Sequence, residues 1–214
     1  MPHKDFIRVQ QRCADLKFTD DRNILRNLRM IKSDLEIEKI ATACSIAGRA
    51  FDRVSEIASE GVALSDVFRK FQMLCLEEGA DWVPYLAGGK GAIGYDDVIS
   101  PATSDPLLKG EVMMLDTGLV HDGYFCDYDR NYAVGMVKPV VAEAWTKLLE
   151  ATDAGITAAC PGNTAADIYN AMDAVLTGGA GGGAAGRLGH GLGMQLTEGM
   201  SFIPDDDTVI SENM

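Results

Sequence analysis

The sequence predicts an α+β fold in which two related helix-helix-strand halves pack about one antiparallel sheet. Three observations predict it: segments with helical periodicity, two apolar runs joined by Asp122-Gly123, and a repeat of residues 56–68 at 157–169. Asp-Gly between apolar runs is a strong hairpin signal, and a repeated helical unit indicates duplication. The chain is 47% hydrophobic and 24% charged, which suits a packed core rather than a disordered chain.

The first half is predicted to open with a helix at the capping box Ser33-Asp34-Leu35-Glu36. Apolar residues then recur at steps of three and four, as on one buried face of a helix. This face comprises Ile37, Ile40, Cys44, Ala47, Phe51 and Val54. Gly61 ends the segment, and a second helix is predicted from about Ser65 to Glu78. Its inward residues are Val67, Phe68, Phe71, Leu74 and Cys75.

Residues 79–110 are rich in Gly, Pro and Asp, and are expected to hold only short β-like pieces. The segment 111–135 then reads as two strands joined by a tight turn. Beyond it, a helix is predicted from about Val140 to Thr157 and another through Leu176.

The two halves align through their helix-helix turns. The matching positions are Gly61 with Gly162 and Asp66 with Asp167, at one constant offset. In each copy one helix stops at a glycine and the next begins after a capping Ser or Thr. A sheet segment follows the first copy, and residues 187–214 are expected to begin its counterpart. Residues 1–32 are polar and are predicted to be a linker or the remnant of an N-terminal domain, and residues 33–214 the main domain.

The apolar runs of the hairpin carry acids: Asp116 in the first, Asp127 and Asp129 in the second. If Asp122-Gly123 is a two-residue loop, Asp116 lies opposite Asp129, and all three carboxylates share one face. A four-residue loop would place Asp116 opposite Asp127, and a three-residue loop would separate them. The side chains of directly opposed residues lie about 5 Å apart.

Carboxylates this close repel one another, and burial increases the repulsion. A solvated hairpin face, a shared proton or a shared cation would each relieve it. Divalent cations suit these oxygen ligands. His190, in the glycine-rich segment GRLGHGLGM, is a candidate fourth ligand because glycine lets a side chain enter a crowded site.

Composition excludes other classes. A formal net charge of −13 argues against a nucleic-acid surface. The sequence contains no run of about 18 apolar residues, so no membrane span is predicted. The first residues lack the apolar h-region of a secretory signal. The five widely spaced cysteines indicate reduced thiols, and we expect a cytoplasmic protein.

At this point the sequence resembles the pita-bread metallopeptidases, which include methionine aminopeptidase, aminopeptidase P and prolidase. RMIKSDLEIEKI resembles the family's opening helix, LDTGLVHDGYFCDYDR its metal hairpin, and GHGLG its metal-histidine motif. The resemblance runs from about Arg29 to the last residue. It implies the pita-bread fold, with the chain truncated at the C-terminus, and is strongest towards Xaa-Pro aminopeptidase and prolidase members. It also suggests a homodimer.

The resemblance implies a site for two divalent metal ions held by two Asp, one His and two Glu ligands. Asp116, Asp127 and His190 match the first three, and the expected Glu ligands fall beyond Met214. Mn, Co, Fe and Zn all suit such ligands, so the metal is not specified. Asp129 stands where relatives often have Thr or Ser, which implies a third acid at the metals.

Two substrate-contacting histidines of the family are absent. The first should fall within Tyr95 to Ser100, so Tyr95, Asp96 and Asp97 are candidates for the substrate pocket. The second should fall seven residues after His190, where Thr197 stands, followed by Glu198. Thr197, Glu198 and Asp129 are therefore further candidates for the substrate pocket.

The expected function is therefore a metal-dependent hydrolase of the Xaa-Pro peptidase type acting on small peptides. The absent histidines favour an alternative, a relative acting on a small amide-like or other non-peptide substrate, as a C–N hydrolase or lyase. Termination before the Glu ligands leaves a third reading, an inactive truncated protein or an interaction module.

Overall fold

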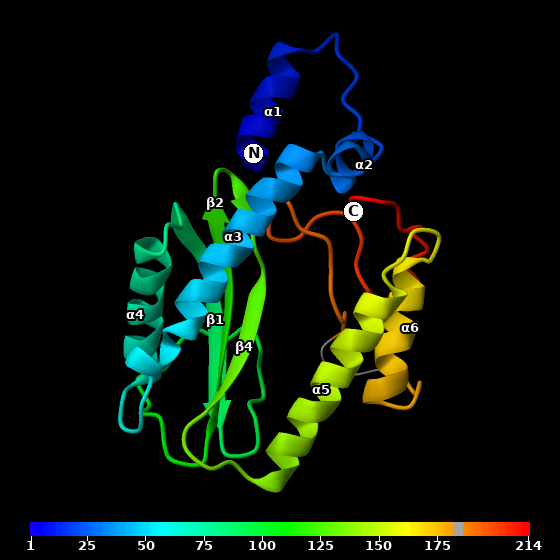
Figure 1. Ribbon diagram of the computed structural model, residues 1–214. Coiled ribbons are helices and arrows are strands. Elements are labelled where there is room, and N and C mark those ends of the chain that lie inside the picture. The colour runs from blue at the N-terminus through cyan, green and yellow to red at the C-terminus, as the bar shows by residue number, and fades with distance from the viewer. Residues whose placement is uncertain (182–185) are drawn as a thin grey trace.

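The structure, a computed structural model, describes residues 1–181 and 186–214. A sheet covered on one face by two helices forms one lobe, and a helical hairpin forms a second lobe (Figure 1). The helices are α1 (His3–Arg12), α2 (Ile24–Met30), α3 (Asp34–Asp52), α4 (Leu64–Glu77), α5 (Pro139–Ala158) and α6 (Ala165–Leu176). A short 3₁₀ turn, η1 (Val54–Glu56), follows α3. The strands are β1 (Trp82–Gly91), β2 (Val112–His121), β3 (Tyr124–Phe125) and β4 (Tyr128–Ala133).

The sheet is antiparallel, with β2 at its centre, β1 on one side and β3 and β4 on the other. The turn after β2 confirms the two-residue loop, because His121 pairs with Tyr124. Asp122 and Gly123 have φ values of 47° and 80°, as a type I′ turn requires. The mixed helix and antiparallel sheet confirm the predicted fold class.

The core of the first lobe lies between the sheet and helices α3 and α4. All five inward residues predicted for the second helix are buried. The predicted face of α3 is wrong in part, since Ile37 is 38% exposed. The residues of α3 that are buried are Ala43, Ile46, Ala47, Ala50 and Phe51. In the first turns of α3, Ile37 and Ile40 face a cavity instead of the core, so periodicity identified the helix but not which of its apolar residues are buried.

Two expectations about strands are also wrong. Residues 79–110 contain β1, a full ten-residue strand, rather than short pieces only. Its glycines and Pro84 obscured it in the sequence, yet they are accommodated by an edge strand with a bulge. In the described part of 187–214, only isolated bridges occur, His190 with Ser201 and Val209 with Thr164. No strand of a second sheet is formed there.

The duplication is visible in backbone hydrogen bonds. Gly61 N donates to Leu107 O at 2.8 Å, and Gly162 N donates to Ile210 O at 2.9 Å. The reciprocal bonds, Leu107 N to Val62 O and Ile210 N to Asn163 O, are also present in both halves. Gly61 and Gly162 have φ values of 87° and 98°, a conformation that favours glycine. An equivalent segment is therefore hydrogen-bonded to the helix-helix turn in each half.

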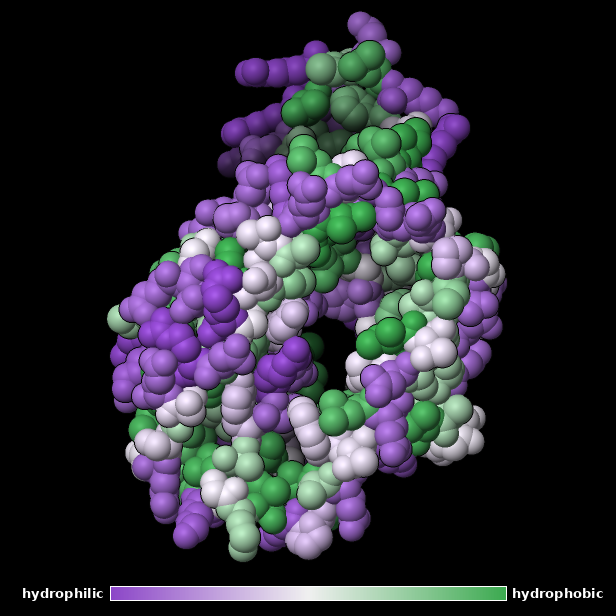
Figure 2. All heavy atoms as spheres, viewed as in Figure 1, coloured by the Kyte–Doolittle hydropathy of each residue, from purple (hydrophilic) through white to green (hydrophobic). Residues whose placement is uncertain are grey.

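Helices α1 and α2 contain no buried residues, and the boundary predicted between residues 32 and 33 stays a prediction. Among the described residues, we find no helix with the length and apolar character needed to cross a bilayer. The surface is hollowed between the two lobes (Figure 2).

Candidate metal centre

The three hairpin acids lie together on the face of the sheet opposite helices α3 and α4. Asp116 of β2 is the direct register partner of Asp129 of β4. The same register places Asp127 across from Gly118, two positions along the strand. Because alternate residues share a face, the hairpin alone gathers three carboxylates at one place.

His190 joins the acids from a distant part of the chain. Its Nε2 lies 3.0 Å from Oδ2 of Asp127. Its Nδ1 faces the carbonyl oxygen of Gly191 at 2.9 Å. The ring is therefore held between two acceptors, with Nε2 directed at the acids.

The loop that carries His190 is fastened to the hairpin at two points. Phe125 N donates to Gly193 O at 2.8 Å. Leu196 occupies the space that a side chain on Gly118 would fill. The absence of a side chain at Gly118 thus lets the loop reach the sheet beside Asp127.

The proximity of the acids and His190 shifts their pKa values. Burial raises the pKa of Asp116 to about 7, and the charges of Asp127 and Asp129 act in the same direction. Asp129 as a residue is exposed, but desolvation of its carboxylate by its neighbours still raises its pKa. The hydrogen bond with Asp127 raises the pKa of His190, although burial opposes it. Without a metal, the cluster therefore favours bound protons.

Tyr85 of β1 is a member of the site that sequence reasoning missed. Its hydroxyl donates to Asp116 Oδ2 at 3.0 Å. The register of β1 shifts between Trp82 and Tyr85, and such bulges re-aim side chains near functional sites. Tyr85 pairs with Gly118 and reaches diagonally to Asp116. No signal marked Tyr85 because β1 itself was not recognised.

The donor set fits a divalent metal in type. Carboxylate oxygens and a neutral imidazole nitrogen are ordinary ligands for Mn, Co, Fe and Zn. Asp116, Asp127 and His190, with Asp129 beside them, would hold the ion. However, no group of three His, Cys, Asp or Glu residues in the described chain is already arranged as a metal cage.

Of the residues predicted for a substrate pocket, Tyr95 lies near the acids. Its hydroxyl donates to Asn131 Oδ1 at 2.9 Å. Burial raises its pKa, and the charge of Asp129 adds to this. Asp97 instead holds its own turn, accepting from Ile99 N and from the hydroxyl of Ser100.

Thr197 and Glu198 belong to the His190 loop but make different contacts. Thr197 is exposed and accepts a hydrogen bond from Arg187 at 3.1 Å. The Glu198 side chain is 8% exposed and forms ion pairs with Arg29 and Lys32. Glu198 therefore joins the segment before α3 to the loop, and the structure does not bring it to the acids.

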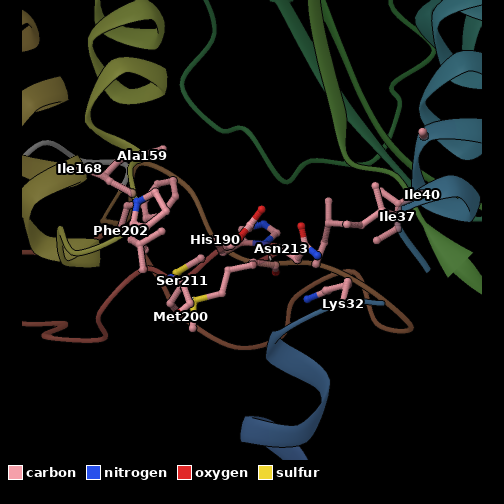
Figure 3. A pocket seen from close by; sticks show the side chains of 17 residues that line it. Lys32, Ile37, Ile40, Ala159, Ile168, His190, Met200, Phe202, Ser211 and Asn213 are labelled. Atoms are coloured by element: carbon pink, nitrogen blue, oxygen red, sulfur yellow. Dashed lines mark hydrogen bonds between the residues drawn. The ribbon is translucent and has the colours of Figure 1, made fainter. Parts of the chain in front are cut away.

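A cavity of about 640 Å³ lies beside His190 (Figure 3). Its walls include Ile37 and Ile40 from α3, Ile168 from α6, and Met200 and Phe202. Of the four clustered residues, only His190 lines it. This cavity is thus a mainly apolar space between the lobes, and Asp116, Asp127 and Asp129 do not line it.

Comparison with known proteins identifies the family. The model of metallopeptidase family M24 matches residues 38–214. The chain therefore belongs to metallopeptidase family M24. It is 29% identical over 205 residues to the Xaa-Pro dipeptidase of Pyrococcus furiosus, covering 94% of this chain and 57% of that protein. It is 30% identical over 218 residues to the Xaa-Pro dipeptidase of Lactobacillus helveticus, covering 99% of this chain and 58% of that one.

Solved structures agree with the fold. The prolidase of Pyrococcus horikoshii superposes with a TM-score of 0.88 at 25% identity, covering all of this chain and 62% of that one. The prolidase of Thermococcus sibiricus gives a TM-score of 0.91 at 22% identity, which supports the fold alone. These matches confirm the predicted pita-bread resemblance. The chain spans about three fifths of the length of the relatives it matches.

Proposed function

We propose that this chain carries part of the active site of a metal-dependent hydrolase of the Xaa-Pro peptidase type, acting on small peptides. The observation that carries the proposal is the convergence of Asp116, Asp127 and Asp129 with His190. The hairpin places three potential ligands on one face, and a loop docked on Gly118 brings the fourth, His190, to Asp127. The M24 membership and the relatives named Xaa-Pro dipeptidase support the same reading.

In this proposal the chain's own residues bind and orient. Asp116 and Asp127 would hold the ions from the hairpin, and His190 would contribute a ligand from the facing loop. Tyr85 fixes the Asp116 carboxylate by its hydrogen bond. When bound, divalent ions lower the pKa of a bound water and polarise a substrate carbonyl. The glycines around His190 allow the loop backbone to approach closely without side-chain obstruction.

A second candidate is a relative that acts on a small non-peptide amide. The observation that favours it is Tyr95, which lies near Asp129 where a substrate-contacting histidine is expected. A phenol with a raised pKa donates a hydrogen bond but does not carry positive charge near neutral pH. A pocket with Tyr95 would therefore offer the substrate carbonyl a neutral hydrogen-bond donor, whereas a pocket with a protonated histidine would also offer positive charge.

The test is hydrolysis of Xaa-Pro dipeptides, with Mn²⁺ or Co²⁺, by the full-length protein that contains this chain and the remaining ligands. We expect cleavage that requires added metal and is abolished in Asp127→Asn. Asp97→Asn is the matched control, since Asp97 only holds an exposed turn. Absence of cleavage with every metal, together with turnover of a small non-peptide amide, would favour the second candidate.

A further inference from the structure

The loop that carries His190 also carries a buried carboxylate that lies away from the three hairpin acids. The Glu198 side chain is 8% exposed and contacts the guanidinium of Arg29 and, at 3.7 Å, the ammonium of Lys32. Lys32 is itself buried, and its Nζ also donates to the carbonyl oxygen of Met30 at 3.1 Å. Because buried charges need partners, this group of three charges fixes the loop against the segment that precedes α3.

The backbone of Glu198 leads directly to the ring of His190. Glu198 N donates to Gly191 O at 2.9 Å. The same carbonyl oxygen lies 2.9 Å from Nδ1 of His190, and the other ring nitrogen is directed at Asp127. A histidine that binds a metal commonly donates its second ring N–H to such an acceptor, which fixes the orientation of the ring. The position of Glu198 therefore determines where the acceptor that orients His190 lies.

Glycines allow the two sides of this loop to approach closely. A Cβ on Gly191 would lie 2.5 Å from the carbonyl oxygen of Glu198, and a Cβ on Gly193 would overlap the carboxylate of Glu198. Gly191 N donates in turn to Met200 O at 3.0 Å. The loop is thus a compact unit, in which a shift of Glu198 also moves Gly191.

The start of α3 contacts both segments that supply the candidate metal ligands. Glu36, in the first turn of α3, accepts a hydrogen bond from the hydroxyl of Tyr124 in the hairpin at 2.9 Å. Lys32, just before α3, contacts Glu198 in the loop. Lys32 and His190 also line the same cavity (Figure 3). The start of α3 therefore connects the loop to the hairpin.

We infer that Glu198 is a positioning residue of the metal centre, which orients the His190 ring through the carbonyl of Gly191. Its ion pairs with Arg29 and Lys32 hold this carbonyl in place. The inference rests on the proposed metal site and deepens it. Loss of the Glu198 charge would leave Lys32 buried without its carboxylate, which is strongly unfavourable, and would release the loop.

The first test is calorimetric titration with Mn²⁺ of the full-length protein that contains this chain. Glu198→Gln keeps the size of the side chain but removes its charge. It should weaken Mn²⁺ binding by about 10- to 100-fold, the effect typical of residues that support a metal ligand. Arg29→Gln removes one partner from a partly exposed position and should weaken binding less, whereas Arg29→Lys keeps the charge and should retain most of the affinity.

Glu111→Gln is the matched control. Glu111 is also a buried carboxylate, with a side chain 12% exposed, and it pairs with Lys90 at 3.0 Å. It belongs to neither the loop nor the segment before α3. Its replacement should destabilise the protein without changing its affinity for Mn²⁺.

The second test needs no metal. The Nδ1 proton of His190, bonded to the Gly191 carbonyl, should exchange slowly with water and give a resolved NMR signal in the metal-free protein with isotope-labelled histidine. The loss of this signal in His190→Gln assigns it. Glu198→Gln should also abolish the signal, and Glu111→Gln should leave it unchanged. A role for Glu198 in stability alone would lower the urea midpoint and leave the signal in place.

A Glu198→Gln variant that keeps both its Mn²⁺ affinity and its His190 signal would overturn the inference, and so would an equal loss of affinity in Glu111→Gln. If Glu198→Gln does not fold, unchanged affinity and signal in Arg29→Gln would overturn it in the same way. If the unaltered protein binds no Mn²⁺ but Glu198→Gln still abolishes the His190 signal, the metal proposal fails and the positioning of His190 by Glu198 stands.

Discussion

Replacing Gly118 by alanine tests how the His190 loop is docked on the hairpin. A Cβ at this position would overlap Leu196 Cδ1 and lie 3.4 Å from both Cγ and Cδ2 of that side chain. The φ of Gly118 is not positive, so the backbone accepts alanine and the cost comes from the contact alone. Overpacking costs about 1–3 kcal/mol. Since Leu196 is only half-buried and can shift, we expect about 1–2 kcal/mol.

The measurement is a double-mutant cycle with Leu196→Ala, using urea unfolding. Truncating Leu196 makes room for the new methyl group, so the double variant should be about 1 kcal/mol more stable than the sum of the single effects predicts. Gly118→Ala should also weaken Mn²⁺ binding, because the displaced loop carries His190.

Gly48→Ala is the matched control, since a Cβ on this glycine of α3 meets nothing within 4 Å. It should be neutral or stabilise the protein by up to about 1 kcal/mol. Additive effects of Gly118→Ala and Leu196→Ala, with unchanged metal affinity, would refute the docking argument.

Three further predictions follow from single contacts. Tyr85→Phe removes the donor to Asp116 and should weaken Mn²⁺ binding by about 10- to 100-fold in calorimetry, whereas Tyr128→Phe, on the opposite face, should not. Thr164→Ala breaks the capping box of α6 and should lower the free energy of unfolding by about 1 kcal/mol; an unchanged urea midpoint would contradict this. Burial opposes ionisation of Asp206, but two backbone N–H donors outweigh it and lower its pKa. Its stabilisation is therefore present above the unfolded pKa and lost as pH falls through the folded pKa, so Asp206→Asn should flatten that part of the pH–stability curve.

Much of the site could be predicted because its information is local. The Asp-Gly turn fixes the register of the hairpin, and register alone places Asp116 across from Asp129. The starts of α3 and α6 were equally readable, since each begins at a capping box. The predicted capping Ser or Thr is wrong for α4, which begins after Ala63 without a side-chain cap. The turn residues thus allowed the shared face of the acids and the repeated helix-helix unit to be predicted from the sequence.

The rest depended on contacts that sequence spacing does not encode. Tyr85 reaches Asp116 only because a bulge in β1 redirects it. Glu198 looked like a pocket residue from its position after Thr197, yet it pairs with Arg29. Such pairings between distant segments depend on tertiary packing, and sequence periodicity does not predict them.

Divalent-metal binding tests the central claim most directly. Calorimetric titration of the purified protein with Mn²⁺ should show binding that weakens by at least about 100-fold in Asp127→Asn and in His190→Ala, since loss of a ligand should exceed the 10- to 100-fold typical of its supporting partners. His121→Ala is the control, because His121 lies at the hairpin turn and its ring faces the carbonyl of Gly79. Binding that is equally strong in all four proteins, or absent from the unaltered protein, would contradict the account.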